Sequence, residues 1–508
     1  MQWDELVKLA LLGTDRSSLS PAMKVELQGY GIDTDKEITE VVLESAALYA
    51  PLQKAGYEPK IWEQPLLAKS REEILANCNK QSAIHLSLIL TGRYPYALTE
   101  FVQGMADYQK CLPFEFLPTL LDKCVKDEFL WEQIEPIIGH RGNWLIELNP
   151  AWQKLKIEVS QEKWEIGTKA ERVAILKKLR QKDSAEGLLM LLSTWAEDGL
   201  SEKTAFLKCL TIGLSDMDEV FLEACLDFPR KEIRENAAIL LSELPNSQLQ
   251  KRIKAYLKEA ITIGKETGIA KPFIILPSAK DKTLIRDGIS PKRKWRRGGE
   301  TTGMLYQMIA IVSPHHWEKQ FQKNPSEILY FFTLSEWAMM LVEGVATAAA
   351  LHGSVDWMEA ILRFWLSNHN NRRWAELNIK RVLEELPNEV FNEALFEKLK
   401  ALKFLPEEHS PLIQLLQKED CPWDDRLTNV LMPQLKEWIA NNVSYSWTGI
   451  QYRKMLKQAA YNISPKKEKQ LSKFWLGASQ NWAGWEKDIQ QFLTVLRFRR
   501  EMLEELEK

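Results

Sequence analysis

The sequence has few of the residue patterns by which disulfide-bonded or metal-binding proteins are recognised. Its 508 residues contain only six cysteines and seven histidines, and no two cysteines form a C-x-x-C pair. Scattered cysteines, two of them on the apolar faces of expected helices at Cys209 and Cys225, are typical of reduced core thiols. His315 and His316 are adjacent, and consecutive side chains on a helix do not face one site. We therefore expect no disulfide framework, no metal and no other cofactor.

Signals for export and membrane insertion are also missing. The amino-terminal segment carries Asp4 and Glu5 ahead of a short apolar run, whereas a secretion signal begins with basic residues. The longest apolar window, Ala338–Leu351, is interrupted by Glu343 and is too short to cross a bilayer. We expect this window to form a buried helix, and we expect the chain to be cytoplasmic.

Strong net charge and catalytic motifs are absent as well. The 67 basic and 70 acidic residues leave a net charge of −3, which provides no global field to attract nucleic acid or a membrane. The stretch from Gly298 to Gly303 resembles a phosphate-binding loop, but Met304 stands where the lysine is needed. No G-x-S-x-G motif occurs. These absences favour a non-enzymatic role, with an enzyme whose unrecognised site lies in a helical groove as an alternative.

What the sequence does contain is helical periodicity, which is clearest from Ser215 to Leu244. Before Pro229, one apolar face is formed at helical spacing by Met217, Val220, Phe221, Ala224 and Cys225. After Pro229, which ends the first helix, a second apolar stripe follows at Ile233, Ala237, Leu240, Leu241 and Leu244. Neither helix can bury its stripe alone, so the pair predicts stacked helical hairpins of the HEAT type.

The expected fold class is therefore all-α, a HEAT-like α-solenoid of stacked hairpins with one irregular basic insertion. The pattern divides the chain into a helical domain at 1–165, a repeat block at 166–263, a basic linker or insertion at 264–303 and a helical domain at 304–508. Thr168 and Glu171 form a capping box at the start of the repeat block. Within the insertion, the runs Phe273–Leu276 and Thr283–Ile285 favour β structure.

Positive charge is concentrated in this insertion. From Lys280 to Arg297, eight lysines and arginines stand against two aspartates, a local charge of +6. The predicted partner contact is the basic loop, defined as Lys292, Arg293, Lys294, Trp295, Arg296 and Arg297. Charge beside one stacking surface suits an acidic protein partner, and it suits nucleic acid as well. A third interpretation is a solvated linker, or guanidinium groups that pair with acidic groups of the solenoid behind them.

A second candidate surface is the corner at 140–152, which brings polar and aromatic groups close together. Its candidate partner-binding residues are Arg141, Trp144 and Trp152. The alternative is a structural turn in which Gly142 takes a positive φ while Asn143 and Arg141 tie down backbone carbonyls.

Four stretches of the sequence carry a resemblance to a known family. They are Trp3–Arg16, the corner Arg141–Leu145 with Asn149–Trp152, the block Glu171–Leu244 and the segment Leu496–Leu503. Together they resemble the bacterial family called domain of unknown function 5691, over nearly the whole chain. The resemblance implies a HEAT-like helical protein and carries over no catalytic residue. Genes for such proteins often lie beside genes for a MoxR-type AAA+ ATPase, a von Willebrand factor A protein and a SWIM zinc-finger protein, which implies membership of a multi-protein system.

The leading hypothesis is a cytoplasmic, non-catalytic helical-repeat scaffold or adaptor that binds a protein partner, with the AAA+ ATPase or the von Willebrand factor A protein as the implied partner. The first alternative is a nucleic-acid-binding helical-repeat protein that uses the 280–297 loop. The second is the enzyme with an unrecognised groove site. No membrane association is expected.

Overall fold

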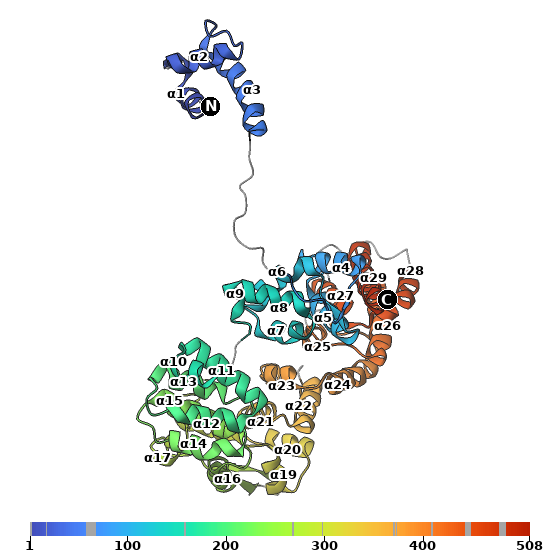
Figure 1. Cartoon of the computed structure of the whole chain (residues 1–508). Helices are drawn as coiled ribbons and strands as arrows, with labels where there is room; N and C mark the ends of the chain where they lie inside the picture. Colours follow the sequence, from blue (N-terminus) through green and yellow to red (C-terminus); the bar gives the residue numbers. More distant parts are fainter. Residues whose placement is uncertain are drawn as a thin grey trace. The chain divides into compact units, whose positions relative to one another are not determined.

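The computed structural model describes most of the chain, namely residues 3–16, 18–56, 68–156, 159–266, 269–296, 298–368, 371, 373–407, 410–441, 449–476 and 484–508. These residues form 29 α-helices and four short strands. They group into two compact units, Met1–Ser70 and Arg71–Lys508 (Figure 1). The expected divisions at residues 165, 263 and 303 fall inside the second unit and stay predictions.

The described part of the first unit contains α1 (Trp3–Leu12), α2 (Pro21–Gly29) and α3 (Ile38–Ala55). Helix α2 begins where the backbone N–H of Met23 donates a 3.2 Å hydrogen bond to the hydroxyl of Ser20. Pro21 follows at the first helical position, where a missing N–H breaks no helical hydrogen bond. The unit has its own buried core: Leu6, Leu9, Leu19, Met23, Leu27, Val41, Val42 and Tyr49.

The second unit is helical throughout most of its length. Its first half contains α4 (Lys80–Leu90), α5 (Leu98–Asp107), α6 (Leu117–Cys124), α7 (Glu128–Ile134), α8 (Gly139–Leu148), α9 (Pro150–Gln153), α10 (Gln161–Ile166), α11 (Lys169–Lys182), α12 (Ser184–Thr194), α13 (Leu200–Cys209), α14 (Glu219–Cys225), α15 (Lys231–Glu243) and α16 (Gln248–Ala260). Its second half contains α17 (Lys282–Arg286), α18 (Glu300–Ile311), α19 (His315–Phe321), α20 (Pro325–Thr333), α21 (Ala338–Leu351), α22 (Val355–Asn368), α23 (Lys380–Glu385), α24 (Asn388–Ala401), α25 (Pro411–Leu415), α26 (Asp425–Asn441), α27 (Ile450–Asn462), α28 (Glu468–Leu476) and α29 (Glu486–Glu507). The prediction of an all-α helical-repeat fold is confirmed.

The repeat block stacks each helix against its neighbours along the chain. Helix α11 packs on α12 and α13, α13 packs on α15, and α15 packs on α14 and α16. The predicted capping box opens α11: the N–H of Glu171 donates to the hydroxyl of Thr168, and the N–H of Thr168 donates to the carboxylate of Glu171. The stripe predicted for α15 is buried as expected, from Ile233 to Leu244.

The stripe predicted for α14 is wrong in part. Cys225 is buried and Phe221 packs against the core, as expected. Met217 and Val220, however, are 64% and 82% exposed, and Leu222 and Leu226 are buried instead. The helical face is rotated because Asp218 turns inward, and Met217 lies beside it in the 3-10 turn that precedes α14.

A buried arginine is the partner that draws Asp218 inward. The guanidinium of Arg180 donates to both carboxylate oxygens of Asp218 at 2.8 and 2.9 Å. It also donates to the carbonyls of Ile212, Gly213 and Ser184, so its N–H groups are satisfied although the side chain is buried. A buried charge needs such a complete shell because unpaired it would cost several kcal/mol, about 3–5 in comparable cases. This long-range pair decides which face of α14 is buried.

The insertion contains a β-hairpin and a helix. Strands β3 (Ile261–Glu266) and β4 (Ile269–Ile274) pair antiparallel, so the β structure expected at Phe273 is confirmed. The run Thr283–Ile285 was expected to favour β structure and this is wrong, because it lies in α17. There Asp281 accepts hydrogen bonds from the N–H groups of Thr283 and Leu284, which starts a helix.

The hairpin is protected at one edge by a proline. The N–H of Ile275 donates to the carbonyl of Ala260, which makes that pair a hydrogen-bonded one. Because such pairs alternate along the ladder, Pro272 opposite Ile263 belongs to a pair without mutual hydrogen bonds. Its nitrogen therefore faces the outer edge of β4, where the absent N–H hinders the pairing of a further strand. The two other strands, β1 (Ala76–Asn77) and β2 (Lys110–Cys111), form a short parallel pair.

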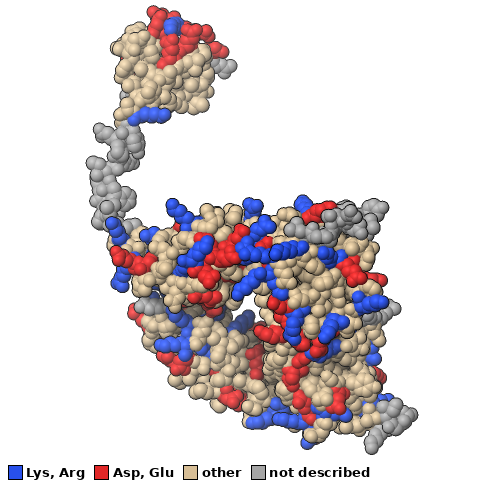
Figure 2. All heavy atoms as spheres, turned by 90° about the vertical axis from the view of Figure 1, so that its right-hand side faces the viewer, with Lys and Arg blue, Asp and Glu red and all other residues tan. Residues whose placement is uncertain are grey.

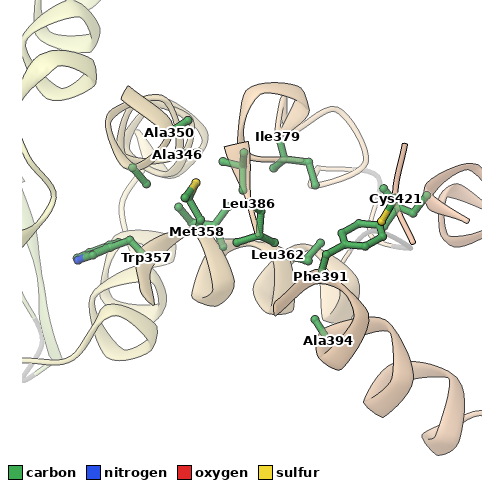
Figure 3. Packing of buried hydrophobic residues seen from close by; sticks show 14 of the residues in the cluster. Ala346, Ala350, Trp357, Met358, Leu362, Ile379, Leu386, Phe391, Ala394 and Cys421 are labelled. Carbon is green, nitrogen blue, oxygen red and sulfur yellow. The ribbon is translucent and has the colours of Figure 1, made fainter. Parts of the chain in front are cut away.

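The core of the second half is built from small residues against large ones. The apolar window Ala338–Leu351 forms helix α21, which is buried along most of its length, so the prediction of a buried helix is confirmed. It approaches α18 closely at Gly344: a Cβ added there would lie only 2.8 Å from Cγ2 of Ile309, so a larger residue would clash. Figure 3 shows the neighbouring packing, which includes Ala346, Ala350, Trp357, Met358, Leu362, Leu386, Phe391 and Ala394. Among the described residues, no helix combines the length and apolarity that crossing a bilayer requires.

The last helix returns to the start of the second unit. Helix α29 packs on α27 and α28, and also on α4 and α5. Arg499 of α29 is buried and donates to both carboxylate oxygens of Glu100 in α5, at 2.7 and 2.8 Å. Its remaining N–H groups reach the carbonyls of Ala460 and Ile463 at the end of α27, at 2.7 and 2.8 Å. One side chain thus joins three helices.

Substitution of this residue should destabilise the second unit. We expect Arg499→Met to lower the free energy of unfolding by about 3 kcal/mol, because Glu100 and two carbonyls lose their buried partner. Arg497→Met on the same helix is the matched control: its side chain is 53% exposed and should contribute below about 1 kcal/mol. Denaturant unfolding measures both, and equal effects of the two substitutions would contradict this role of Arg499.

Candidate functional site

The basic loop is held by contacts within the chain. Gln307 of α18 donates to the carbonyls of Ser290 and Arg293 at 2.9 and 3.0 Å. The guanidinium of Arg293 pairs with Glu235 of α15 at 2.7 Å. In the preceding segment, Arg286 pairs with Asp227 at 2.7 Å. Part of the local positive charge is thus matched by acidic groups of the repeat block.

Arg296 and Trp295 converge on one buried carboxylate. Arg296 donates to Glu343 of α21 at 2.6 Å, and the indole N–H of Trp295 donates to the same side chain at 3.3 Å. Arg296 also pairs with Glu376 at 3.2 Å, and it adopts a positive φ of 46°. These contacts place Trp295 and Arg296 in structural roles.

The remaining basic-loop residues are placed differently. Lys292 and Lys294 are exposed, and neither side chain forms an ion pair with the residues that the structure describes. Arg297 lies outside the described residues. Among the described residues of the predicted contact, these two lysines are the cations that form no ion pair.

The corner at 140–152 is mostly helical, and the expectation of a positive φ at Gly142 is wrong. The positive φ, 67°, belongs to Gly139, and Gly142 lies within α8. The helix begins here because Glu73 accepts hydrogen bonds from the N–H groups of His140 and Arg141, at 2.6 and 2.8 Å. As expected, Asn143 ties down a carbonyl, that of Gly139, at 2.8 Å.

The three candidate residues of the corner contribute largely to packing. The guanidinium of Arg141 lies over the ring of Phe114 at 3.9 Å. Trp152 is 8% exposed, and its indole N–H donates to Asp122 at 2.8 Å. Trp144 is half-buried in α8. Only the outer face of Arg141 and part of Trp144 are accessible.

Among the described residues, one group has ligand types suited to a metal ion: His315, Glu318 and Asp356. Nδ1 of His315 lies 2.8 Å from Glu318 and its Nε2 lies 3.9 Å from Asp356. Each ring nitrogen faces a different carboxylate, so the imidazole lies between the two acidic side chains. The neighbouring His316 is largely buried, and burial lowers its pKa to about 4.

A site that was not predicted is an open cleft of about 1000 Å³ in the second unit. Four parts of the chain line it: the turn at 92–96 before α5, Gln417 and Glu419 after α25, one face of α27 and one face of α29. The floor is apolar and includes the buried residues Ala460, Phe492 and Val495.

The two helices present matching rows of polar side chains, which we call the two stripes. The stripe of α27 has residues at i, i+3, i+4 and i+7: Lys454, Lys457, Gln458 and Tyr461. The stripe of α29 has the same spacing: Lys487, Gln490, Gln491 and Thr494. This spacing places each stripe on a single helix face.

The two helices run parallel, so the stripes are in register. Near their starts, Arg453 of α27 pairs with Asp488 of α29. About two to three turns later along each helix, Arg499 of α29 donates to the carbonyls of Ala460 and Ile463 of α27. Because both contacts advance in the same direction, the lysine ends of the stripes lie together, and so do the tyrosine and threonine ends.

The lysine end of the cleft is positively charged. Four cationic side chains line the cleft against one carboxylate, that of Glu419. We call Lys454, Lys457 and Lys487 the cleft lysines; all three are exposed, and within the described part of the chain none forms an ion pair. Unpaired cations on one rim attract an acidic ligand.

The opposite end is aromatic. Tyr96, which is 50% exposed, lies edge-to-face with Tyr461 at a centroid distance of 5.2 Å. Burial raises the pKa of Tyr461 to about 12, so its hydroxyl keeps its proton near neutral pH and can donate a hydrogen bond.

A comparison with known families gives a full-length match. The sequence model described as "Family of unknown function (DUF5691)" matches residues 5–506. The chain belongs to this family. A search of the curated proteins found no match. For this DUF5691 protein, the family assignment agrees with the resemblance seen in the sequence.

Apolar periodicity does not predict the cleft of this DUF5691 protein, because it identifies only the buried faces of helices and the cleft is lined largely by polar faces. The patterns K-x-x-K-Q-x-x-Y at 454–461 and K-x-x-Q-Q-x-x-T at 487–494 stand in the sequence at helical spacing. They could have indicated two polar faces. Their alignment, and the approach of Tyr96 to Tyr461, depend on tertiary packing.

The structural role of Arg296 can be tested by stability. We expect Arg296→Met to lower the free energy of unfolding by about 1–3 kcal/mol, because Glu343 is buried and loses its charged partner. Lys294→Met, which removes an exposed cation without an ion pair, should change it by less than about 0.5 kcal/mol. Denaturant unfolding compares them. An Arg296→Met variant as stable as the parent chain would contradict this structural role, and Arg296 would again be a candidate for partner binding.

Proposed function

We propose that this protein is a non-catalytic helical-repeat scaffold or adaptor that holds a protein partner, and that the partner contacts the cleft. The proposal rests most directly on the cleft lysines, three exposed cations without an ion pair in the described part of the chain, aligned on two parallel helices. Elsewhere in the second unit, arginines are matched by carboxylates, as at Arg293 and Arg296. Unmatched cations on one rim can steer an oppositely charged partner, and the neighbouring tyrosines fit the enrichment of aromatic residues at binding surfaces.

The composition of the cleft favours binding over catalysis. Among the residues that the structure describes, its lining includes one carboxylate, Glu419, and no histidine or cysteine. General acid–base chemistry commonly uses a histidine or a pair of carboxylates with shifted pKa values. Four glutamines and four cations instead supply hydrogen bonds and charge.

A protein partner is favoured over nucleic acid by the distribution of charge. On the face drawn in Figure 2, basic and acidic side chains are interspersed, without a continuous positive track. The arginines at 293 and 296 in the basic loop are paired with carboxylates of the same chain. Nucleic acid binding draws its affinity from several phosphate contacts along one surface, and paired arginines contribute less to such a surface.

The finer proposal concerns the setting. Because the family resemblance implies a system with a MoxR-type AAA+ ATPase and a von Willebrand factor A protein, we propose one of these as the partner, in the cytoplasm. A helical-repeat surface that holds one component while another acts on it suits an adaptor in such a system.

The test is capture of the partner from the native host by tagged full-length chain, followed by identification of what co-elutes. Lys454→Glu, Lys457→Glu and Lys487→Glu together should reduce capture of the ATPase or the von Willebrand factor A protein about tenfold or more, and added salt should weaken the parent interaction. The matched control is Lys292→Glu with Lys294→Glu, which changes exposed basic-loop lysines.

The two variants separate the two surfaces. Unchanged capture by the cleft variant would contradict the proposal, and loss confined to the control would assign the contact to the basic loop. Circular dichroism of both variants verifies that the fold is retained.

A further inference from the structure

We propose that the cleft binds a short acidic segment of the partner in extended conformation, followed by an apolar residue. This inference deepens the proposed function and rests on it, since it names the chemistry of the segment that the cleft receives. It is carried by the arrangement of charge, amide groups and aromatic rings along the two stripes.

The length of the stripes sets the length of the segment. Each stripe spans seven residue steps of an α-helix, which is about 10 Å. An extended peptide rises about 3.3 Å per residue, so about three to four residues fill the cleft. A longer ligand would have to leave the cleft at its ends.

The order of groups along the cleft sets the order of residues in the segment. Lys454 and Lys487 lie together at one end because they flank the contact between Arg453 and Asp488. Lys457 follows one helical turn later. Carboxylates of the ligand are therefore placed at this end, where three cations have no competing partner among the described residues.

Amide groups occupy the middle of the cleft. The side chains of Gln490 and Gln491 are exposed on α29, and each offers both a donor and an acceptor. An extended peptide presents alternating N–H and C=O groups, which such amides can satisfy. The sugar–phosphate backbone of a nucleic acid offers acceptors and lacks the matching donors of a peptide.

The aromatic end suits one apolar side chain. Tyr96 and Tyr461 meet edge to face at an interplanar angle of 70°, above an apolar floor that includes Phe492 and Val495. Single-stranded nucleic acids stack successive bases on open ring faces. Here one ring directs its edge at the other, so the pair forms the wall of a pocket rather than two stacking platforms.

The positive charge at this end comes from lysines. Arginine binds phosphate and carboxylate through a planar fork, whereas lysine is a point charge on a flexible stem. A lysine cluster without a fork tolerates carboxylates at variable positions, as in a run of aspartate and glutamate. We therefore assign an acidic peptide rather than a phosphorylated one.

The experiment is fluorescence anisotropy with the full-length chain and four labelled probes. The first probe is the four-residue peptide Glu-Asp-Glu-Leu, and the second replaces its acidic residues by lysine. The third keeps the acids and replaces Leu by Ser, and the fourth is a twelve-nucleotide thymidine strand. The variants are Lys454→Gln with Lys457→Gln and Lys487→Gln, and Tyr461→Ala, with Lys292→Gln and Lys294→Gln as the control.

The acidic peptide with the apolar end should bind most tightly. Neutralising the cleft lysines should weaken it at least tenfold, and Tyr461→Ala should weaken it severalfold while leaving the serine-ended peptide unchanged. The control should bind like the parent chain. Equal or tighter binding of the thymidine strand, or peptide binding that is indifferent to the cleft lysines, would overturn the inference.

Failure of this inference is distinguishable from failure of the proposed function. If capture from the host depends on the cleft lysines while none of the peptides binds, the acidic-segment inference falls and the scaffold proposal stands. If the acidic peptide binds as described while capture does not depend on the cleft, the inference stands and the scaffold proposal falls.

Discussion

The buried guanidinium of Arg499 is the contact on which the organisation of the second unit depends. It joins two positions 399 residues apart, Arg499 and Glu100, and it satisfies two carbonyls at the end of α27 as well. A charge with so little access to water is tolerated only when its partners are complete. The geometry of three helices is therefore fixed around one side chain.

The cleft follows from this joint. Phe498, beside Arg499, stacks on Tyr94 at a centroid distance of 3.7 Å, which brings the turn at 92–96 against α27 and α29. The apolar faces of the two parallel helices are used in packing, and their polar stripes are left along one open side. The open cleft thus results from the way the end of the chain returns to the start of the second unit.

Charge is used in two ways in the second unit. Arg180 and Arg296 are paired with buried carboxylates, so they hold helices together and carry little charge to the surface. The cleft lysines have no such pairing among the described residues, and their charge is exposed to solvent. A count of charges along the sequence does not separate these uses. For this reason the local excess of charge indicates the basic loop as the partner contact and does not indicate the cleft.

Local patterns in the sequence predicted local structure well. The buried stripe of α15, the bounds of α21 and the capping box of α11 each depend on residues of a single helix or its cap. The face predicted to be buried on α14 was wrong in part, because Asp218 is buried in an ion pair with Arg180, which is 38 residues away. The prediction of β structure at Thr283–Ile285 was wrong because the capping residue Asp281 starts a helix there, and this cap outweighs the β propensity of the run.

The site was harder to predict than the fold. Both polar stripes are visible in the sequence as periodic lysines and glutamines, but their parallel alignment depends on the contacts of Arg453 and Arg499. The pairing of Arg296 with Glu343 likewise joins segments that sequence spacing does not relate. Sequence patterns do not predict these ion pairs, because the paired residues are far apart in the sequence.

The central claim is that the exposed side of the parallel helices α27 and α29 is where the partner lies. Amine-reactive footprinting, read by mass spectrometry on the free chain and on the complex purified from the host, measures this directly. The account predicts rapid modification of Lys454, Lys457 and Lys487 in the free chain and several-fold slower modification in the complex, with Lys292 and Lys294 unchanged. Protection of Lys292 and Lys294, with the cleft lysines equally reactive in both states, would contradict it.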